Sequence, residues 1–373
     1  MSKLQELIKE LCPDGVEFRK LGEVCEIKRG VRVVKNDLIN DGKYPVFQNS
    51  LIPLGYYDKN NYPANITFVI SAGAAGEIGY TEEPIWAADD CLTIISPNNI
   101  INKFIYYCLI ANKLFFVSKV RRASVPRLSR TVVDNFEIPI PPLEIQSEIV
   151  RILDTFTAHT AELQAELQAE LQARKEQYEY YRNKLLTFDE NDEGVKWMKL
   201  NEFAEIGTGS SNTQDELSDG LYPFFVRSQI VRSKNEYEFD ETAIITSGDG
   251  VGVGKIFHYV EGKYALHQRA YRIHILDNTV MPKFFFYYMR SEFYNYITKN
   301  AFSSSVTSIR KPMLLNFPVP LPPLSEQQRI VSILDKFESL VNDLSEGLPA
   351  EIAAVQEQYE YYRNKLLTFK RKS

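Results

Sequence analysis

The sequence predicts an α/β (α+β) protein with an internal pseudo-two-fold repeat: two compact mixed bodies, each followed by a long helix, with the two helices paired as an antiparallel coiled coil. Three observations predict this fold class. The segment EQYEYYRNKLLTF occurs letter for letter at residues 176–188 and 357–369. Apolar residues recur at three- and four-residue steps along the stretch that ends in each copy, which is typical of a long helix. Elsewhere, short apolar runs between Gly, Asn and Asp favour strands.

The spacing of the repeat indicates where the two copies differ. The triplet PPL at residues 141–143 recurs at 322–324, a shift of 181 that holds through both helical segments. Further upstream the shift falls to 178 for Tyr44 and Tyr222, and to 176 when Ser71 is matched with Ser247. Each copy, at roughly 180 residues, is large enough for its own core. The sequence therefore predicts a first body at 1–142, a first arm at 143–188, an acidic linker at 189–194, a second body at 195–323 and a second arm at 324–373.

The two arms are predicted to be helices that cover each other's apolar stripe. A Pro-Pro-Leu triplet begins each arm, and proline is tolerated in the first turn of a helix. About 45 residues at a rise of ~1.5 Å reach roughly 65–70 Å. Neither helix could bury so long a stripe alone, and two equal helices of one chain that fold back on each other pack antiparallel. Gly347 and Pro349 predict a kink in the second arm.

The first arm contains a shorter repeat, AELQ, at Ala161, Ala165 and Ala169. One interpretation is a solvated helix with Glu on its outer face, since every residue of the repeat is a good helix former. The other is a ruler: one four-residue unit changes the length of the arm by ~6 Å, close to two base-pair steps of DNA at ~3.4 Å each.

The two bodies are predicted to be mixed α/β domains with short strands. Strand-like runs occur at residues 66–71, 92–96, 243–247 and 270–275. An aromatic-rich helix follows in each body, at 104–117 and 284–297, and its rings are expected to pack in the core.

Composition and cysteine spacing exclude several classes of protein. The chain has no apolar run of ~18 residues and no signal peptide, so we expect a cytoplasmic protein without a membrane partner. Its four cysteines, Cys12, Cys25, Cys91 and Cys108, have no CxxC spacing, which indicates neither disulfides nor a zinc site.

No catalytic signature is found. The Gly-rich stretch SGDGVGVGK at 247–255 departs from a phosphate-binding loop, because Asp249 stands where Gly is needed and Ile256 where Ser or Thr should follow the Lys. Of the four histidines, His159 is in the first arm and the other three are in the second copy, so the copies share no His base. We therefore expect no catalytic residue, no metal and no cofactor, and a chain that is not an enzyme by itself.

The charge pattern leaves nucleic acid open as a ligand despite a net charge of −6. The acidic excess lies in the arms and in the linker DENDE, which leaves the bodies mildly basic. Basic residues gather in loops of both bodies, and this recurrence favours function over ordinary solvated loops. The clusters are Lys28, Arg29, Arg32 and Lys35, then Arg121, Arg122, Arg127 and Arg130, then Arg227, Arg232 and Lys234, then Arg310 and Lys311.

Taken in order, these motifs resemble the specificity subunit (HsdS) of type I restriction-modification systems. IPPL or LPPL after each body, a Q-x-x-IV-x-ILDxF helix and an EYYRNKLLTF end occur twice, and the resemblance covers nearly the whole chain. It implies that each body is a target-recognition domain that reads one half of a bipartite site in double-stranded DNA. It also implies that the paired arms set the gap and bind two methyltransferase (M) subunits that modify adenine, and that a restriction (R) subunit, the motor and nuclease, joins that complex.

Under this interpretation, base contacts should come from polar and basic side chains on loops of the bodies, where a bidentate contact is worth ~1–3 kcal/mol. Asp89 and Asp90 repel phosphate and stand where the family often has an Asn-Gln stretch, which leaves their part in contact open. In the first body the candidates are Arg29, Arg32, Gln48, Asn49, Ser71, Arg121, Arg122, Ser124, Arg127 and Arg130. In the second they are Ser210, Asn212, Arg227, Gln229, Arg232, Gln268, Arg269, Ser304, Ser305, Arg310 and Lys311.

The apolar stripes of the arms supply the candidates for a subunit interface. A rival hypothesis from another class is a non-catalytic coiled-coil adaptor whose bodies grip protein; it predicts no sequence-selective DNA binding. The candidate interface residues are Ile149, Leu153, Phe156, Tyr178, Tyr181 and Leu185 in the first arm, and Ile330, Leu334, Phe337, Tyr359, Tyr362 and Leu366 in the second.

Overall fold

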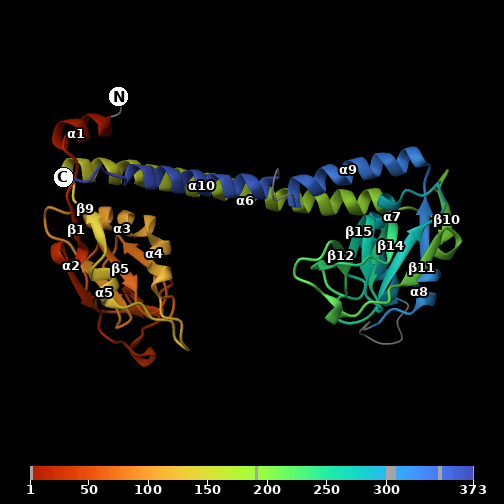
Figure 1. Cartoon of the computed structure of the whole chain (residues 1–373), viewed down its shortest axis with the longest axis horizontal. Coiled ribbons are helices and arrows are strands. Elements are labelled where there is room, and N and C mark those ends of the chain that lie inside the picture. Colours follow the sequence, from red (N-terminus) through yellow and green to blue (C-terminus); the bar gives the residue numbers. More distant parts are fainter. Residues whose placement is uncertain (1–2, 190–191, 300–307, 343–346, 373) are drawn as a thin grey trace. The chain divides into compact units, whose positions relative to one another are not determined.

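The structure is a computed structural model that describes residues 3–189, 192–299, 308–342 and 347–372 (Figure 1). The chain divides into two compact units: unit one is Met1–Glu166 with Ile352–Ser373, and unit two is Leu167–Glu351. Each unit therefore contains one body and a part of each arm. Among the helices in the described ranges, none combines the length and the apolar character needed to cross a membrane.

Body one, in unit one, is a mixed α/β domain in which two small sheets pack beside short helices. One sheet has the order β2-β8-β5-β6, a second has the order β4-β3-β7, and β1 pairs with β9 near the arm. The strands are β1 (Phe18–Lys20), β2 (Glu26–Arg29), β3 (Tyr44–Phe47), β4 (Gly55–Tyr57), β5 (Ile66–Ile70), β6 (Ile78–Thr81), β7 (Trp86–Ala87), β8 (Cys91–Ile95) and β9 (Glu137–Pro139). The helices of unit one outside the arms are α1 (Lys3–Leu11), α2 (Leu21–Val24), α3 (Asn102–Ala111), α4 (Lys113–Ser118) and α5 (Arg130–Asp134), with a 3-10 turn η1 (Lys35–Asp37).

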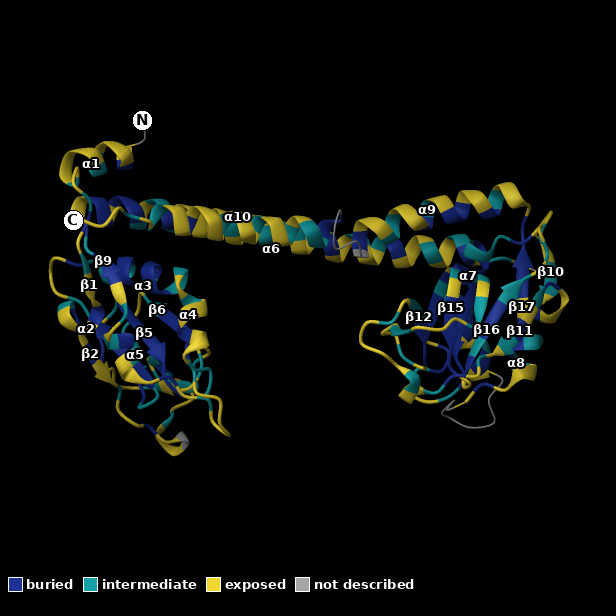
Figure 2. Cartoon of the chain, viewed as in Figure 1, coloured by how far each residue is buried: buried dark blue, intermediate teal, exposed yellow. Residues whose placement is uncertain are grey.

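Body two, in unit two, has the same strand order in one continuous sheet, β11-β16-β14-β15-β12-β13, and again a separate pair, β10 with β17. The strands are β10 (Lys196–Lys199), β11 (Ala204–Thr208), β12 (Tyr222–Phe225), β13 (Arg232–Lys234), β14 (Phe239–Ser247), β15 (Phe257–Leu266), β16 (Ala270–Ile275) and β17 (Pro318–Leu321). Its helices are α7 (Pro282–Lys299) and α8 (Lys311–Leu315), with 3-10 turns η2 (Leu200–Glu202) and η3 (Thr213–Asp215). In both bodies the strands are largely buried and the loops at their ends exposed (Figure 2).

One residue explains why the sheet is split in body one. The long strand β15 of body two corresponds to β6 and β7 of body one, which are separated by residues 82–85. Pro84 lies in that gap and has no backbone N–H to donate, so it cannot continue a paired strand. A similar interruption, at Asn112, separates α3 from α4, where body two has the single helix α7.

The hydrogen bonds correct the register of the repeat by one residue. The backbone N–H of Leu128 donates to the carbonyl of Ser71, and the N–H of Ile309 donates to that of Gly248. Since Leu128 and Ile309 are 181 apart, Ser71 corresponds to Gly248, and the match of Ser71 with Ser247 is wrong. The error arose because Ser71 is identical to Ser247, whereas its true counterpart, Gly248, is a different residue.

The first arm is the continuous helix α6 (Leu143–Leu186), which contains all three AELQ units. The second arm contains α9 (Leu324–Asn342) and α10 (Leu348–Leu366), and Gly347 lies in a bend just before α10; residues 343–346 lie outside the described ranges. Pro349 falls in the first turn of α10, where its missing N–H costs nothing. Gly347 and Pro349 thus lie at the start of α10, and the kink itself stays a prediction, because the preceding residues lie outside the described ranges.

Within unit one, α6 and α10 run antiparallel. The Thr157 hydroxyl lies 2.9 Å from the Tyr359 hydroxyl, and the Gln164 side chain donates to that of Gln356 at 3.2 Å, so numbers rise along one helix as they fall along the other. Within unit two, the ring of Phe337 on α9 stacks on Tyr181 of α6 with centroids 5.7 Å apart. Phe156 and Tyr362 make the equivalent ring contact in unit one, at 6.1 Å.

A buried glutamine ties each body to its arm. Gln146 is fully buried; its Oε1 accepts from the Ile101 N–H at 2.9 Å and its Nε2 donates to the carbonyls of Pro141 and Asn99. Gln327, equally buried, repeats the three bonds with the N–H of Met281 and the carbonyls of Pro322 and Thr279. These are the glutamines that open each Q-x-x-IV-x-ILDxF motif, so the motif fixes how the arm leaves the body.

Candidate nucleic-acid interface

Five loops of body one meet at the end of its sheets away from α6 (Figure 1). The Ser71 N–H donates to the Asp90 carbonyl, the Ala74 N–H to that of Asn49, and the Gly73 N–H to that of Pro126. Gly73 has φ +81°, and a Cβ there would lie 2.8 Å from Asn49, so this close approach needs glycine. We call this surface loop cluster one and define it as residues 29–34, 48–54, 71–76, 88–90 and 121–128.

Most predicted arginines of body one lie in loop cluster one with their charge free. The backbones of Arg121 and Arg127 exchange two hydrogen bonds, which closes a short loop with Ser124 exposed at its tip. Among the described residues, no carboxylate pairs with Arg32, Arg121, Arg122 or Arg127, and the Arg29 guanidinium donates only to the Asp89 carbonyl oxygen at 3.3 Å. Free cations on braced loops suit phosphate contact. Arg130 lies at the start of α5, paired with Asp134 at 3.3 Å.

The remaining candidates of body one are placed differently. Asn49 is exposed and Gln48 is half-buried in the loop between β3 and β4. Ser71 is buried, and its hydroxyl donates to the Asp90 carbonyl at 2.9 Å, so it is engaged within the body and not offered to a ligand. Asp90 and Arg269 occupy equivalent positions, because the first accepts from the N–H of Ser71 and the second from that of Gly248.

Body two has the matching surface, which we call loop cluster two and define as residues 209–215, 226–231, 247–255, 267–269 and 308–311. The same backbone bonds hold it: the His267 N–H donates to Phe225 as the Ala88 N–H donates to Phe47. Here two arginines share one carboxylate. Asp249 accepts from Arg227 at 2.5 Å and from Arg269 at 3.4 Å. A hollow of about 340 Å³ opens beside them, lined among others by Arg227, Arg232 and Asp249.

The other candidates of body two divide by their partners. Arg232 is paired with Glu216, and the Gln268 amide donates to the Asn212 side chain. Ser210 donates to Glu238 through both its N–H and its hydroxyl, at 2.7 and 3.2 Å. Gln229, Arg310 and Lys311 are exposed, and no carboxylate within the described ranges pairs with the two cations. Ser304 and Ser305 lie outside the described residues.

The sequence did not indicate the carboxylates that hold these side chains. Asp249, Glu216 and Glu238 lie between 16 and 28 residues from these partners along the chain, so no helical or strand spacing connects them. The sequence signal was Asp249 itself, an acid inside a Gly-rich stretch where a phosphate-binding loop needs glycine.

The electrostatics of loop cluster two also act on His267. Burial, and then the positive charges of Arg227 and Arg269, lower the pKa of His267 below its ordinary value. Its Nδ1 accepts a hydrogen bond from the Arg269 N–H at 3.0 Å, which only a ring unprotonated at that nitrogen can do. The neutral histidine thus helps to fix the backbone beside Arg269.

The predicted interface residues of the arms separate into buried and exposed groups. Ile149, Leu153, Ile330 and Leu334 are fully buried in the cores of their own units, and Tyr178 is nearly so; Leu185, Leu366, Phe337 and Tyr359 are partly covered. Phe156, Tyr181 and Tyr362 remain exposed. In unit one an apolar groove of about 310 Å³ runs between α6 and α10 beside Phe156 and Tyr362. The aliphatic residues of the arms therefore pack against the bodies. Among the predicted interface residues, the exposed aromatic side chains Phe156, Tyr181 and Tyr362 are the ones accessible to a partner.

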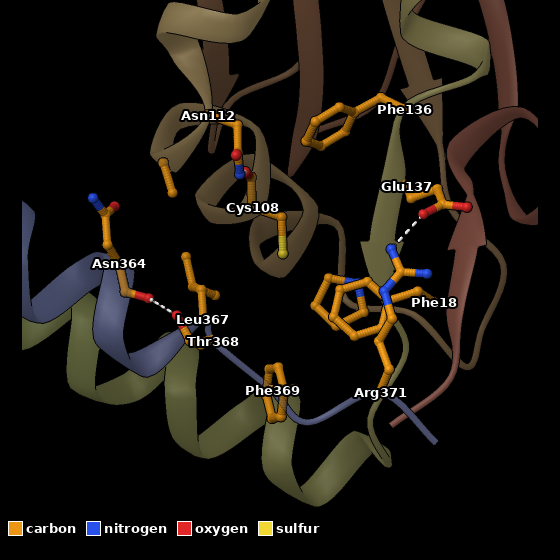
Figure 3. A pocket seen from close by; sticks show the side chains of 12 residues that line it. Phe18, Cys108, Asn112, Phe136, Glu137, Asn364, Leu367, Thr368, Phe369 and Arg371 are labelled. Atoms are coloured by element: carbon orange, nitrogen blue, oxygen red, sulfur yellow. Dashed lines mark hydrogen bonds and ion pairs between the residues drawn. The ribbon is translucent and has the colours of Figure 1, made fainter. Parts of the chain in front are cut away.

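A larger cavity lies in unit one between body one and residues 364–371 (Figure 3). Its volume is about 440 Å³, and Cys108, Phe136, Leu367 and Arg371 are among its lining residues. The position of Cys108 is filled in body two by Tyr288, whose ring packs on Phe317 with centroids 5.7 Å apart. The cavity thus follows from a small residue in one copy. No group of three or more His, Cys, Asp or Glu side chains in the described ranges is placed to hold a metal ion.

Comparisons with known proteins agree with this architecture. The family model described as "Type I restriction modification DNA specificity domain" matches residues 13–173 and 192–354. The specificity subunit of the type I restriction enzyme EcoR124I/EcoR124II of Escherichia coli is 31% identical over 409 residues, covering 99% of this chain and 98% of that protein.

Two solved structures share the fold. A chain from a study of complex assembly and conformational transition in a type I restriction-modification system matches with a TM-score of 0.60 at 18% identity, over 95% of this chain and 97% of that one. The HsdS subunit of Thermoanaerobacter tengcongensis matches with a TM-score of 0.58 at 17% identity, over 96% and 97%.

Proposed function

This chain belongs to the type I restriction modification DNA specificity family, and from that membership we propose that it reads a bipartite, asymmetric DNA site for a type I restriction-modification complex. Body one recognises one half-site through loop cluster one, and body two recognises the other through loop cluster two. The chain contributes specificity without catalysis and needs no cofactor of its own. The observation that carries the proposal is a pair of equivalent loop surfaces on one scaffold, both rich in arginine and different in sequence.

The chemistry of each loop surface supports DNA as the ligand. Arginine can donate two parallel hydrogen bonds to guanine, and Asn or Gln can do the same with adenine. Loop cluster one offers Arg29, Arg32, Asn49 and Arg127, and loop cluster two offers Arg227, Gln229, Gln268 and Arg269. Because equivalent positions carry different side chains, the two half-sites should differ in sequence.

The arms supply the second part of the proposal, which is the spacing and the partners. A continuous helix such as α6 keeps a fixed length, and its AELQ units set the gap between half-sites. Both arms end in the same sequence, and its exposed residues match: Tyr180 is 59% exposed and Tyr361 is 60% exposed. Two identical surfaces fit two copies of one partner, so we assign one methyltransferase subunit to each, with the restriction subunit added to that complex.

Mapping of methylated bases tests the proposal directly. The chain is co-expressed with its methyltransferase subunit, and modified positions in genomic DNA are located by single-molecule sequencing. We expect methylated adenine in a two-part motif with a fixed gap. A stable complex with an active methyltransferase that gives no motif would contradict the proposal and favour the adaptor hypothesis.

A further inference from the structure

Each loop cluster presents several exposed apolar side chains, Val31 and Val251 among them, and in each cluster one of these is an isoleucine that folding does not explain. Ile52 lies in the loop between β3 and β4 and is 77% exposed; Ile230 lies in the loop between β12 and β13 and is 76% exposed. The two residues are equivalent, because the Tyr44 and Tyr222 strands that precede them are matched by the same shift of 178. A side chain left this exposed gains almost nothing from burial, and a single one would need no explanation. Here the same residue recurs in both copies.

The turn that carries the isoleucine is built in the same way in both bodies. In body one the Ser50 hydroxyl accepts from the Ile52 N–H at 3.3 Å and donates to the Ile52 carbonyl at 2.9 Å. In body two the Ser228 hydroxyl accepts from the Ile230 N–H at 3.1 Å. Serine bonds of this kind hold a local turn. The isoleucine is therefore presented on a braced tip.

The base of each tip is anchored in the middle of its loop cluster. In body one the Asn49 carbonyl accepts from the Ala74 N–H at 2.9 Å. In body two the Ser228 carbonyl accepts from His258 Nε2 at 2.9 Å, and Arg227 is paired with Asp249. Both isoleucines therefore project from the surface that carries the arginines.

The pattern of shared and different residues indicates what the isoleucine does. Copy one reads NSLI at residues 49–52 and copy two reads RSQI at 227–230, so only the turn-forming serine and the isoleucine are common. Asn49 and Arg227, or Leu51 and Gln229, can distinguish two different half-sites. A residue present at both should make a contact that does not depend on base identity. A branched apolar side chain among arginines is suited to the base stack, where isoleucine is one of the residues that proteins insert between base steps.

We propose that Ile52 and Ile230 are wedges, one for each half-site, that insert at a base step of the bound duplex and unstack it. This inference rests on the proposed function and adds DNA distortion to it. Each body then recognises its half-site partly through how easily that step opens.

The test uses the complex of the full chain with its methyltransferase subunits, on duplexes that carry the mapped recognition sequence. 2-Aminopurine replaces single bases at successive positions other than the methylated adenines, and its fluorescence rises where stacking is lost. We expect a rise at one step in each half-site. Ile52→Ser should abolish the rise in one half-site and Ile230→Ser in the other, each with about a tenfold loss of affinity, whereas the leucine variants retain both signals.

Matched controls separate the wedge from general surface effects. Leu114 on α4 is 84% exposed and Leu276 after β16 is 65% exposed, and neither belongs to a loop cluster. Leu114→Ser and Leu276→Ser should leave the signals unchanged. The wedge is wrong if the wild-type complex gives a two-part methylation motif but no rise in 2-aminopurine fluorescence. It is also wrong if both isoleucine-to-serine variants retain the rise. In either case the proposed function stands. Absence of any motif overturns both.

Discussion

Body one and body two share a scaffold but differ in how they hold most of the arginines of their loop clusters. In loop cluster one, Arg121 and Arg127 have no carboxylate partner among the described residues, whereas in loop cluster two Asp249 pairs with both Arg227 and Arg269. A free arginine can follow the phosphate backbone, while a paired one keeps a set orientation that can match a base edge. From this difference we propose that the shared framework fixes where a DNA contact is made, and that the loop carboxylates decide which kind of contact it is.

The largest expected effect leaves both bodies unchanged. Deletion of one AELQ unit, residues 165–168, should shorten the preferred gap without altering either half-site, because it removes ~6 Å of helix and touches no loop. Binding to the original site should fall more than about a hundredfold, since one half-site is then out of register and each lost base pair costs ~1–3 kcal/mol. Methylation mapping of the variant gives the new gap. An unchanged gap would exclude the arm as the ruler.

Next in size is a pair of core variants that should act equally on the two scaffolds. Gln146→Leu leaves the Ile101 N–H and two carbonyls without this partner, the buried one at Pro141 among them, and Gln327→Leu does the same in unit two, where the buried carbonyl is that of Pro322. Unsatisfied buried groups cost ~1–3 kcal/mol each, so we expect a loss of about 3 kcal/mol in the unfolding free energy of the affected unit. Hydrogen exchange in increasing urea measures each unit separately.

A matched control for these glutamines is Gln172→Leu. Gln172 is exposed and bonds only to Glu176 on the same helix, so its loss should change stability by less than about 0.5 kcal/mol. Strongly unequal effects of the two core variants would contradict the view that the scaffolds are equivalent.

A smaller effect should separate the two kinds of arginine. Arg127→Ala should weaken binding about tenfold on every sequence and reduce the slope of log affinity against log salt by about 1. Arg227→Ala should also cost about tenfold, but mainly on the specific site, so that one half-site becomes degenerate in the methylation map. Salt-dependent binding measurements and mapping report the two outcomes. Arg19, an exposed arginine paired with glutamates near the arm, gives the control variant Arg19→Ala.

The reverse pattern would break the comparison. If Arg127→Ala relaxes a half-site while Arg227→Ala only lowers the salt slope, ion pairing in the free protein does not decide how an arginine is used.

The sequence predicted the features that follow from periodicity along the chain. It did not predict the features that depend on contacts between residues far apart in the sequence. The letter-for-letter segment and the apolar steps were sufficient for the mixed α/β fold and the long helix α6. The slip at Ser71 arose because the shift between copies changes within the bodies, and backbone bonds such as that from Leu128 locate Ser71 in register. Asp249 was noted as a mismatch to a phosphate loop, and its pairing with Arg227 was not foreseen. Such a pair depends on where two loops meet, which no spacing along the chain encodes.

The smallest expected effect is a pH dependence confined to unit two. Burial lowers the pKa of His258 and of His267 in unit two, whereas the histidine of unit one, His159, is exposed on α6. As pH falls below the ordinary value of ~6.5, the unfolded chain binds protons at these positions before the folded one does. The stability of unit two is therefore complete above that pH and decreases below it. Hydrogen exchange at pH 7.5 and 5.5, corrected for intrinsic rates, should show lost protection in unit two only. The double variant His258→Gln, His267→Asn keeps one donor and one acceptor, and it should remove the difference. An equal loss of protection in both units would mean that these histidines do not cause the pH dependence.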